Sequence, residues 1–458
     1  MLGDSGRRSC VVNFPLSWPP EPISGVMVTG MLTPDGARDF ASPPGEAERL
    51  LAAVPGYRCN IDIPRYDVDA LADALQFVDD VESSLAARVD AFWHYWEREP
   101  WDFFFPTFVF HDRLGHLLWK FMTAGEGFDE HPHAAVLRPR IYSIYKRFDA
   151  FLGQLLDQRP DDLRLFLCSD HGFGGTLWFF EVNAWLEEMG LLVLKPGARL
   201  RARAFYAAMD LEERRELRRF LPGGLRSAVR GRIRRGRSSF RDELGEAVDW
   251  SRTRAFFPSV PLQGVVVCDR REGPGGGPLA AAEIARIRQE IREGLLQLQL
   301  PTGERAVDHV WTREELFSGA FAAWAPDLLF EARGYACLGR PVLGARAFFR
   351  DCRQQPNGFH RMDGVFMALG DGVAPGPLSG PAARIADIAP TLLHALGEAL
   401  PDDLDGRVLA SAFESGWLRD HPVRYRAAAP WTPLPQHAWE AGESAGLSER
   451  LRALGYVD

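Results

Sequence analysis

Two Asp–His pairs are the residues of this sequence best suited to chemistry. Asp112 and His116 lie in FHDRLGH, and Asp170 and His171 lie in SDHGFGG. Carboxylate oxygens and imidazole nitrogens together suit zinc, and also manganese or iron. If a helix begins at Asp112, the spacing of four residues places His116 on the same helix face. Either pair alone would more often be a helix cap with a local hydrogen bond.

The elements predicted around these pairs would bring them to one place. Two near-continuous apolar runs, at 101–110 and 163–168, are typical of strands buried in a parallel sheet, and each leads into one of the pairs. A helical pattern with Pro139 near its first turn connects them and predicts a right-handed β–α–β unit. Because ligands bind beyond the carboxyl ends of parallel strands, we expect Asp112 and Asp170 at one sheet edge. The two pairs together therefore favour a metal site.

The rest of the chain also alternates between strand-like and helical patterns. We expect further strands at 264–268, 327–331 and 365–369, and helices at 181–189, 281–297 and 385–396. The hydrophobic share of 46% and the charged share of 25% are typical of a globular protein. No apolar run approaches the roughly 18 residues of a membrane helix, and the first residues lack the apolar region of a secretory signal. The sequence predicts a soluble α/β protein.

Charge and cysteine content narrow the function classes. The net charge of −9 gives no global basic field to attract nucleic acid. Six scattered cysteines without C-x-x-C spacing fit reduced thiols and a cytoplasmic location better than a disulfide framework. Residues 195–241 differ, with fifteen Lys and Arg against four Asp and Glu. This segment could contact nucleic acid or an anionic membrane, but a solvated helical surface is the favoured interpretation.

Other residues are weaker candidates. His360, in PNGFHRMDG, would by itself be a loop histidine without a role. His131 and His133 have no predicted strand to position them and are interpreted as surface residues. Asp327 and Arg361 could assist phosphate binding, but a strand-end cap and a surface arginine are the favoured interpretations, so neither is assigned to the site.

Several segments together resemble the alkaline phosphatase superfamily, and most closely its type I phosphodiesterase / nucleotide pyrophosphatase branch. The resemblance is carried by DRLGHLLW, by SDHGFGG followed by VNAWLEEMGLL, by GFHRMDGVFMALG, and by FPLSWPPEPISGVMVTGMLTP, IADIAPTLLHALG, LPDDLDGRVL and LRALGY. It runs over nearly the whole chain and is weakest in the basic segment. The ordered set D-x3-H, S-D-H-G and G-x-H is a fairly specific signature.

The resemblance implies a fold as well as a chemistry. The fold would be an alkaline-phosphatase-like α/β/α sandwich around a mostly parallel mixed sheet, with an arginine-rich helical insert. Residues 1–194 and 248–430 would form the two parts of this core, and 195–247 a basic helical insert or cap. Residues 431–458 would form a C-terminal tail with a short helix.

The chemistry implied is that of a two-metal phosphoester hydrolase. By the family pattern, Asp112, His116 and His360 would hold one divalent ion, and Asp170 and His171 the other. Zinc is expected, with manganese as the alternative. Two metals would clamp the attacking and leaving oxygens of an in-line displacement, while a metal-bound Thr or Ser attacks phosphorus. The expected partner is a phosphorylated small-molecule substrate with a phosphodiester or pyrophosphate bond.

The early part of the chain departs from the family pattern. In the family, an Asp that completes the second metal site and the nucleophile both precede the D-x3-H motif. The first residues, MLGDSGRRSCVVNFP, resemble the region that follows them. The favoured interpretation is that the natural protein is longer and carries both groups upstream of Met1. The alternative is a true truncation, with one three-ligand and one two-ligand metal position and without the nucleophile that the covalent route requires. Asp4, Ser5, Ser17 and Thr33 are the early acidic and hydroxyl candidates; no predicted strand precedes any of them, so the catalytic nucleophile is left unassigned.

Four other functions are weighed against this interpretation. A sulfatase would need a C-x-P-x-R segment, which none of the six cysteines supplies. A phosphomutase-like enzyme with two manganese ions would share the metal ligands. A non-catalytic relative would bind a phosphorylated ligand without turnover, and a binding module would act through 195–241. The sequence does not predict the oligomeric state.

Overall fold

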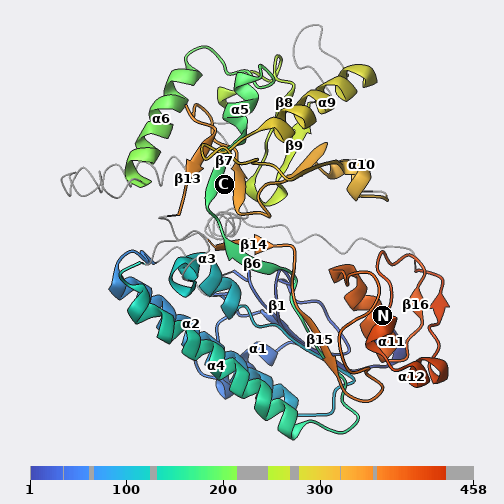
Figure 1. Cartoon of the computed structure of the whole chain (residues 1–458). Coiled ribbons are helices and arrows are strands. Elements are labelled where there is room, and N and C mark those ends of the chain that lie inside the picture. Colours follow the sequence, from blue (N-terminus) through green and yellow to red (C-terminus); the bar gives the residue numbers. More distant parts are fainter. Residues whose placement is uncertain are drawn as a thin grey trace.

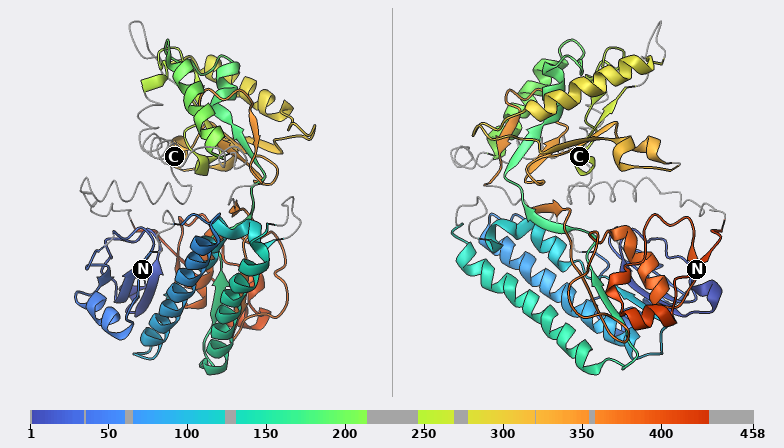
Figure 2. Two further views of the ribbon diagram at one scale, coloured as in Figure 1. Left: turned by 90° about the vertical axis from the view of Figure 1, so that its left-hand side faces the viewer. Right: turned by 45° about the vertical axis from the view of Figure 1, so that its right-hand side comes forward.

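The protein folds into two lobes, and the chain passes from the first lobe into the second and then returns to the first (Figure 1). The computed structural model describes residues 2–34, 36–60, 66–123, 131–213, 246–268, 278–319, 321–353 and 358–429. The first lobe contains the described residues up to 175 and those from 358 onward, and the second lobe contains 178–353. Two further views show the lobes joined near strands β6 (Gly172–Gly175) and β14 (Gly358–Arg361) (Figure 2).

A mostly parallel sheet forms one half of the first lobe. Its strands, in the order β3-β2-β1-β4, are β1 (Ser9–Phe14), β2 (Gly25–Thr29), β3 (Ala41–Ser42) and β4 (Phe103–Pro106). Strands β2, β1 and β4 are parallel, and β3 is antiparallel to β2. Four helices accompany this sheet: α1 (Glu46–Ala53), α2 (Leu71–Trp96), α3 (Phe110–Met122) and α4 (Ala134–Gln158).

The long helix α2 was not predicted from the sequence, although its pattern is clear. Phe77, Val78, Val81 and Leu85 recur at helical spacing and are buried. They pack with α3 and α4 in one core cluster, which also contains Leu114. Burial of each such side chain contributes roughly 1.5–3 kcal/mol, so this cluster fixes helix α3 in place.

The predicted succession of strand, helix and strand is present, but the two strands are not paired with each other in the described residues. Strand β4 is only four residues long, because the chain turns into helix α3 at Phe110. Helix α4 begins at Ala134, so Pro139 lies in its second turn. Strand β5 (Leu165–Cys168) pairs antiparallel with β15 (Phe366–Leu369), and no described ladder joins it to β4. Among the described strands, β4 pairs with β1 and β5 with β15, and both β4 and β5 are half-buried, which corrects the expectation that both are fully buried.

The β5–β15 pair lies between two layers of helices. Leu165 packs toward Phe151 of α4, whereas Phe166 packs toward Trp417. On the Trp417 side lie η5 (Ile385–Asp387), α11 (Ile388–Ala395), the bridge of β16 (Leu400–Pro401) with β17 (Tyr425–Arg426), η6 (Ala410–Ala412) and α12 (Ser415–Asp420). The first lobe is thus layered α/β/α, and the predicted mixed α/β fold class is confirmed.

The second lobe has its own sheets and core. One sheet has the order β12-β7-β13, and the other the order β10-β11-β9-β8. Its strands are β7 (Trp178–Glu181), β8 (Ala255–Phe256), β9 (Gly264–Val267), β10 (His309–Thr312), β11 (Leu328–Glu331), β12 (Cys337–Arg340) and β13 (Phe349–Asp351). Its helices are α5 (Val182–Glu188), α6 (Ala198–Glu213), α9 (Ala281–Gln297) and α10 (Arg313–Leu316). Phe180, Phe257, Ile291 and Phe330 belong to one core cluster of this lobe.

The predicted domain boundaries at 194 and 247 fall inside this second lobe. Of the predicted basic insert, residues 214–245 lie outside the described residues, as does the predicted tail from 430 onward. The remaining predicted strands and helices are present, close to their expected bounds. Among the described helices, none has the length and apolar character needed to cross a membrane.

Candidate metal centre

Asp112 and His116 lie one turn apart on helix α3. The helix begins at Phe110, directly after β4, so Asp112 is in its first turn. The Oδ1 atom of Asp112 lies 3.3 Å from Nε2 of His116. The predicted spacing therefore brings the two side chains together on one face.

His360 reaches the same place from strand β14. This strand pairs antiparallel with β6, with His360 opposite Phe173. Strand β14 also packs directly against α3. The approach is so close that a Cβ atom on Gly358 would be 2.1 Å from the carbonyl oxygen of Gly115. Only glycine permits this approach. As a result, Nε2 of His360 lies 3.1 Å from Nε2 of His116.

The three potential ligand atoms form a nearly equilateral triangle. Nε2 of His360 is 3.3 Å from Oδ1 of Asp112, which completes sides of 3.1, 3.3 and 3.3 Å. A tetrahedral ion with ligand distances of 2.0–2.2 Å requires ligand–ligand edges of about 3.3–3.6 Å. Oδ1 of Asp112 is buried and makes no hydrogen bond of normal geometry within the described residues. The donor types and the spacing both fit a zinc-like divalent ion.

The electrostatics of this triangle suit a cation. Burial alone would raise the pKa of Asp112, but His116, His360 and Arg113 outweigh it and hold that pKa well below its usual range. Burial lowers the pKa of His360, against the opposing effect of Asp112. An ionised carboxylate and a neutral imidazole are the states that bind a metal.

Asp170 and His171 adjoin the triangle but are less enclosed. The ring of His171 stacks on His360 with centroids 3.7 Å apart, and its Nε2 lies 3.9 Å from Oδ1 of Asp112. Its Nδ1 lies 2.9 Å from the carbonyl oxygen of Gly172, so Nδ1 carries the proton and Nε2 is free to bind a metal. The side chain of Asp170 is 79% exposed, with one carboxylate oxygen 3.6 Å from Nε2 of His171. All five predicted ligands thus lie at one site.

Phe173 is a site residue that the sequence interpretation missed. Its ring centroid lies 5.0 Å from that of His116 and 5.6 Å from that of His360. A Cβ on Gly115 would be 2.6 Å from the Phe173 ring, so this glycine also admits the aromatic side chain. The available signal was an aromatic residue between glycines in SDHGFGG, directly after a candidate ligand pair.

The early hydroxyl and acidic residues have local roles. Strand β1 precedes Ser17 and β2 precedes Thr33, so the expectation that no strand precedes them is wrong. The hydroxyl of Ser17 donates to the carbonyl of Phe14 at 2.5 Å, and that of Thr33 to Gly30 at 2.6 Å. Asp4 and Ser5 lie in the short helix η1 (Gly3–Ser5).

His131 and His133 are partly buried, which corrects their interpretation as surface residues. The ring of His131 packs at 4.8 Å against Phe121, at the end of α3. Nε2 of His133 lies 3.3 Å from the carbonyl oxygen of Asp69, and His133 precedes the first residue of α4. Both side chains therefore help to join α3, α4 and the start of α2.

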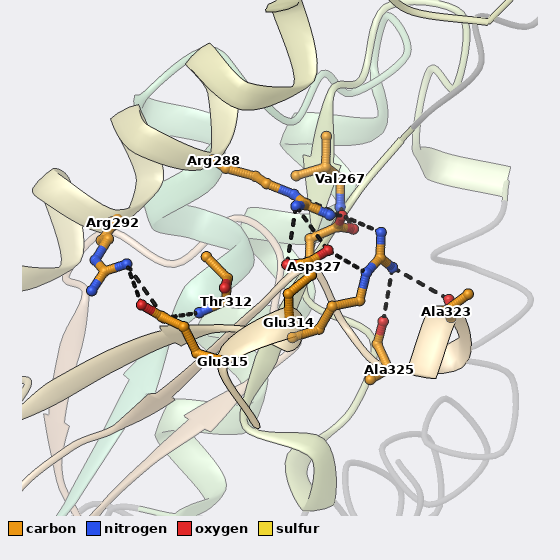
Figure 3. A network of polar contacts seen from close by, with 10 residues as sticks. Val267, Arg288, Arg292, Thr312, Glu314, Glu315, Ala323, Ala325 and Asp327 are labelled. Atoms are coloured by element: carbon orange, nitrogen blue, oxygen red, sulfur yellow. Dashed lines mark hydrogen bonds and ion pairs between the residues drawn. The ribbon is translucent and has the colours of Figure 1, made fainter. Parts of the chain in front are cut away.

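Asp327 belongs to a polar network of the second lobe (Figure 3). Its buried carboxylate accepts hydrogen bonds from the backbone N–H of Val267 at 2.8 Å and from Nε of Arg288 at 3.0 Å. An ion pair with Arg313 adds a third partner at 3.2 Å. Asp327 directly precedes β11, so the predicted strand-end role is confirmed.

Comparison with known protein families places the chain in the alkaline phosphatase superfamily. The chain belongs to the type I phosphodiesterase / nucleotide pyrophosphatase family, whose profile matches residues 17–254, more than half of the 458 residues. This match contains Asp112, His116, Asp170 and His171, while His360 lies beyond it. No curated protein and no solved structure shows significant similarity to the chain.

Proposed function

We propose that this protein is a metal-dependent hydrolase of phosphodiester or pyrophosphate bonds, acting on a nucleotide-type phosphorylated small molecule. The observation that supports this most directly is the triangle of ligand atoms from Asp112, His116 and His360, with sides of 3.1–3.3 Å. It occurs on a chain of a family named for this chemistry. Carboxylate and imidazole donors at tetrahedral spacing favour zinc, with manganese as the alternative.

Two metal positions are proposed. Asp112, His116 and His360 would hold one ion, and Asp170 and His171 would hold a second beside it. When bound, such ions offset the negative charge of a phosphoryl group and lower the pKa of an attacking oxygen.

The residues of the chain prepare the site in three ways. Asp112 supplies a carboxylate that stays ionised at neutral pH, because its pKa lies well below the usual range. The hydrogen bond from Nδ1 of His171 to the backbone keeps its Nε2 directed toward Asp112. Phe173 packs on His116 and His360 and shields these rings from water on that side. The attacking group is not assigned to any residue of the chain.

A second function, binding of a phosphorylated ligand without turnover, is supported by the unequal build of the two positions. Among the described residues, the first has three clustered side chains, whereas the second has His171 and an Asp170 side chain that is 79% exposed. A position with two protein ligands binds metal weakly. A chain that fills only the first position would retain phosphate affinity without the two-metal clamp.

Turnover of bis(4-nitrophenyl) phosphate with and without zinc tests the first proposal. Hydrolysis should require added metal, stop after chelation, and be lost in Asp112→Ala and His360→Ala. Asp149→Ala, at an exposed position on α4, is the control for loss of a carboxylate. Hydrolysis that survives chelation or His360→Ala would refute the proposal. Zinc-dependent binding of a thiophosphate analogue without turnover would establish the second function instead.

A further inference from the structure

Arg361 occupies a position that the proposed function does not use. It follows His360 on strand β14, and because successive strand residues point to opposite faces, its side chain lies on the side away from the metal ligands. Its Nη1 donates to the carbonyl oxygen of Tyr335 at 2.8 Å and to that of His360 at 3.1 Å. Its Nη2 donates to the carbonyl oxygen of Gly175. Arg361 is therefore half-buried, not a surface arginine as the sequence suggested.

These three carbonyl groups belong to three different segments. Gly175 ends β6, His360 lies in β14, and Tyr335 lies in the turn before β12 of the second lobe. A guanidinium group suits this arrangement because its planar fork presents several N–H donors in fixed directions. One side chain thus connects β6, which follows His171, and β14, which contains His360, to the second lobe. Figures 1 and 2 show these strands at the junction of the lobes.

Gly174 has no side chain and so leaves the space that the guanidinium group occupies. A Cβ atom at this position would lie 2.5 Å from Nε and 2.9 Å from Cζ of Arg361. Gly174 pairs with Phe359, next to His360, in the β6–β14 ladder. The side chain of Arg361 therefore lies across β6, close to where β6 follows His171.

We propose that Arg361 is a positioning residue of the metal centre. Its hydrogen bonds to backbone carbonyls hold β6 and β14 in the relative position that brings His171 and His360 toward Asp112. They also attach this pair of strands to the second lobe. The inference rests on the proposed function, since it requires that these residues bind a metal. Groups that orient metal ligands from behind typically change metal affinity by about 10- to 100-fold when they are removed.

Cobalt(II) replaces zinc as the probe, because its visible spectrum reports ligand geometry without any turnover. Arg361→Met should weaken cobalt binding by roughly 10- to 100-fold and alter the bound spectrum. Arg361→Lys should recover only part of the affinity, because a single ammonium group cannot bridge three carbonyls in fixed directions. The matched control is Arg164→Met. Arg164 also donates to backbone carbonyls, of Asp371 and Ala395, but at the start of β5, away from the ligands.

Gly174→Ala is a second route to the same effect. The added methyl group would displace the flexible guanidinium end while Arg361 itself remains, so this variant should fold and still lose cobalt affinity. Wild-type affinity and spectrum in both Arg361→Met and Gly174→Ala would overturn the proposal, as would an equal loss in Arg164→Met. A wild-type chain that binds no cobalt would instead refute the metal centre on which the inference rests.

Discussion

Asp112→Asn separates a metal centre from an ordinary polar cluster. The substitution keeps the size of the side chain but removes the only anionic donor of the triangle, whose Oδ1 lies 3.3 Å from each imidazole nitrogen. In a purely structural cluster, an amide could replace the carboxylate as a hydrogen-bond partner of His116 and His360. In a metal site, the same change removes a ligand and its charge.

The expected magnitude follows from linkage between binding and unfolding. At a free zinc concentration 100 times the dissociation constant, binding stabilises the native state by about 2.7 kcal/mol. If Asp112→Asn weakens binding about 100-fold, the same zinc concentration stabilises the variant by only about 0.4 kcal/mol. For a domain of about 150–250 residues, these values correspond to rises in Tm of roughly 5–10 °C and about 1 °C.

Scanning calorimetry in a zinc buffer, with a metal-free scan of each variant, measures this increment. Comparing each variant with its own metal-free form cancels any effect of the substitution on the apo protein, including the loss of the ion pair with Arg113. Asp149→Asn, on the exposed face of α4, should keep the full zinc increment. An undiminished zinc increment in Asp112→Asn would refute the metal assignment of the triangle.

Three further predictions address the neighbouring residues. His171→Ala should lower the zinc bound at equilibrium with saturating zinc from two ions toward one ion per chain, by elemental analysis; an unchanged content would remove His171 from the site. Asp327→Ala should destabilise the second lobe by about 1–3 kcal/mol in urea unfolding, since it removes the acceptor of the buried Val267 N–H and a partner of the half-buried Arg288 and Arg313, yet leave zinc affinity unaltered. Burial lowers the pKa of His131 to about 4. Between about pH 6.5 and 4, this histidine is therefore protonated in the unfolded chain but not in the native protein, so the free energy of unfolding falls on acidification. His131→Gln should flatten this fall, and an identical pH profile would contradict the burial argument.

The sequence predicted the part of the site that depends on local spacing. Four residues separate Asp112 from His116, and a helix converts that spacing into proximity whatever the rest of the fold does. The wrong details concern pairing between distant segments. Strand β5 pairs antiparallel with β15 and not with β4. The segment LRLFLC does not predict this, because an apolar run indicates burial but not the identity of the neighbouring strand.

His360 shows why the remaining ligand was harder to predict. It is separated from His116 by 244 residues, and its own surroundings, PNGFHRMDG, read as a loop. The family resemblance alone assigned it to the first metal position. The physical cause of its placement is the close contact between Gly115 and Gly358, and a sequence pattern does not show which two glycines will face each other.

The position of the second lobe explains how such a distant ligand can be held accurately. The lobe is inserted between β6 and β14, and its two attachment points, Gly175 and Gly358, are paired residues of that ladder. The strands therefore form a hairpin whose connection is an entire lobe. The hairpin itself carries His360 and begins beside His171, so the ligand geometry depends on the ladder and on helix α3, not on the length of the inserted chain. Because His360 lies in this ladder, the proposed metal ligands lie close to the junction of the two lobes.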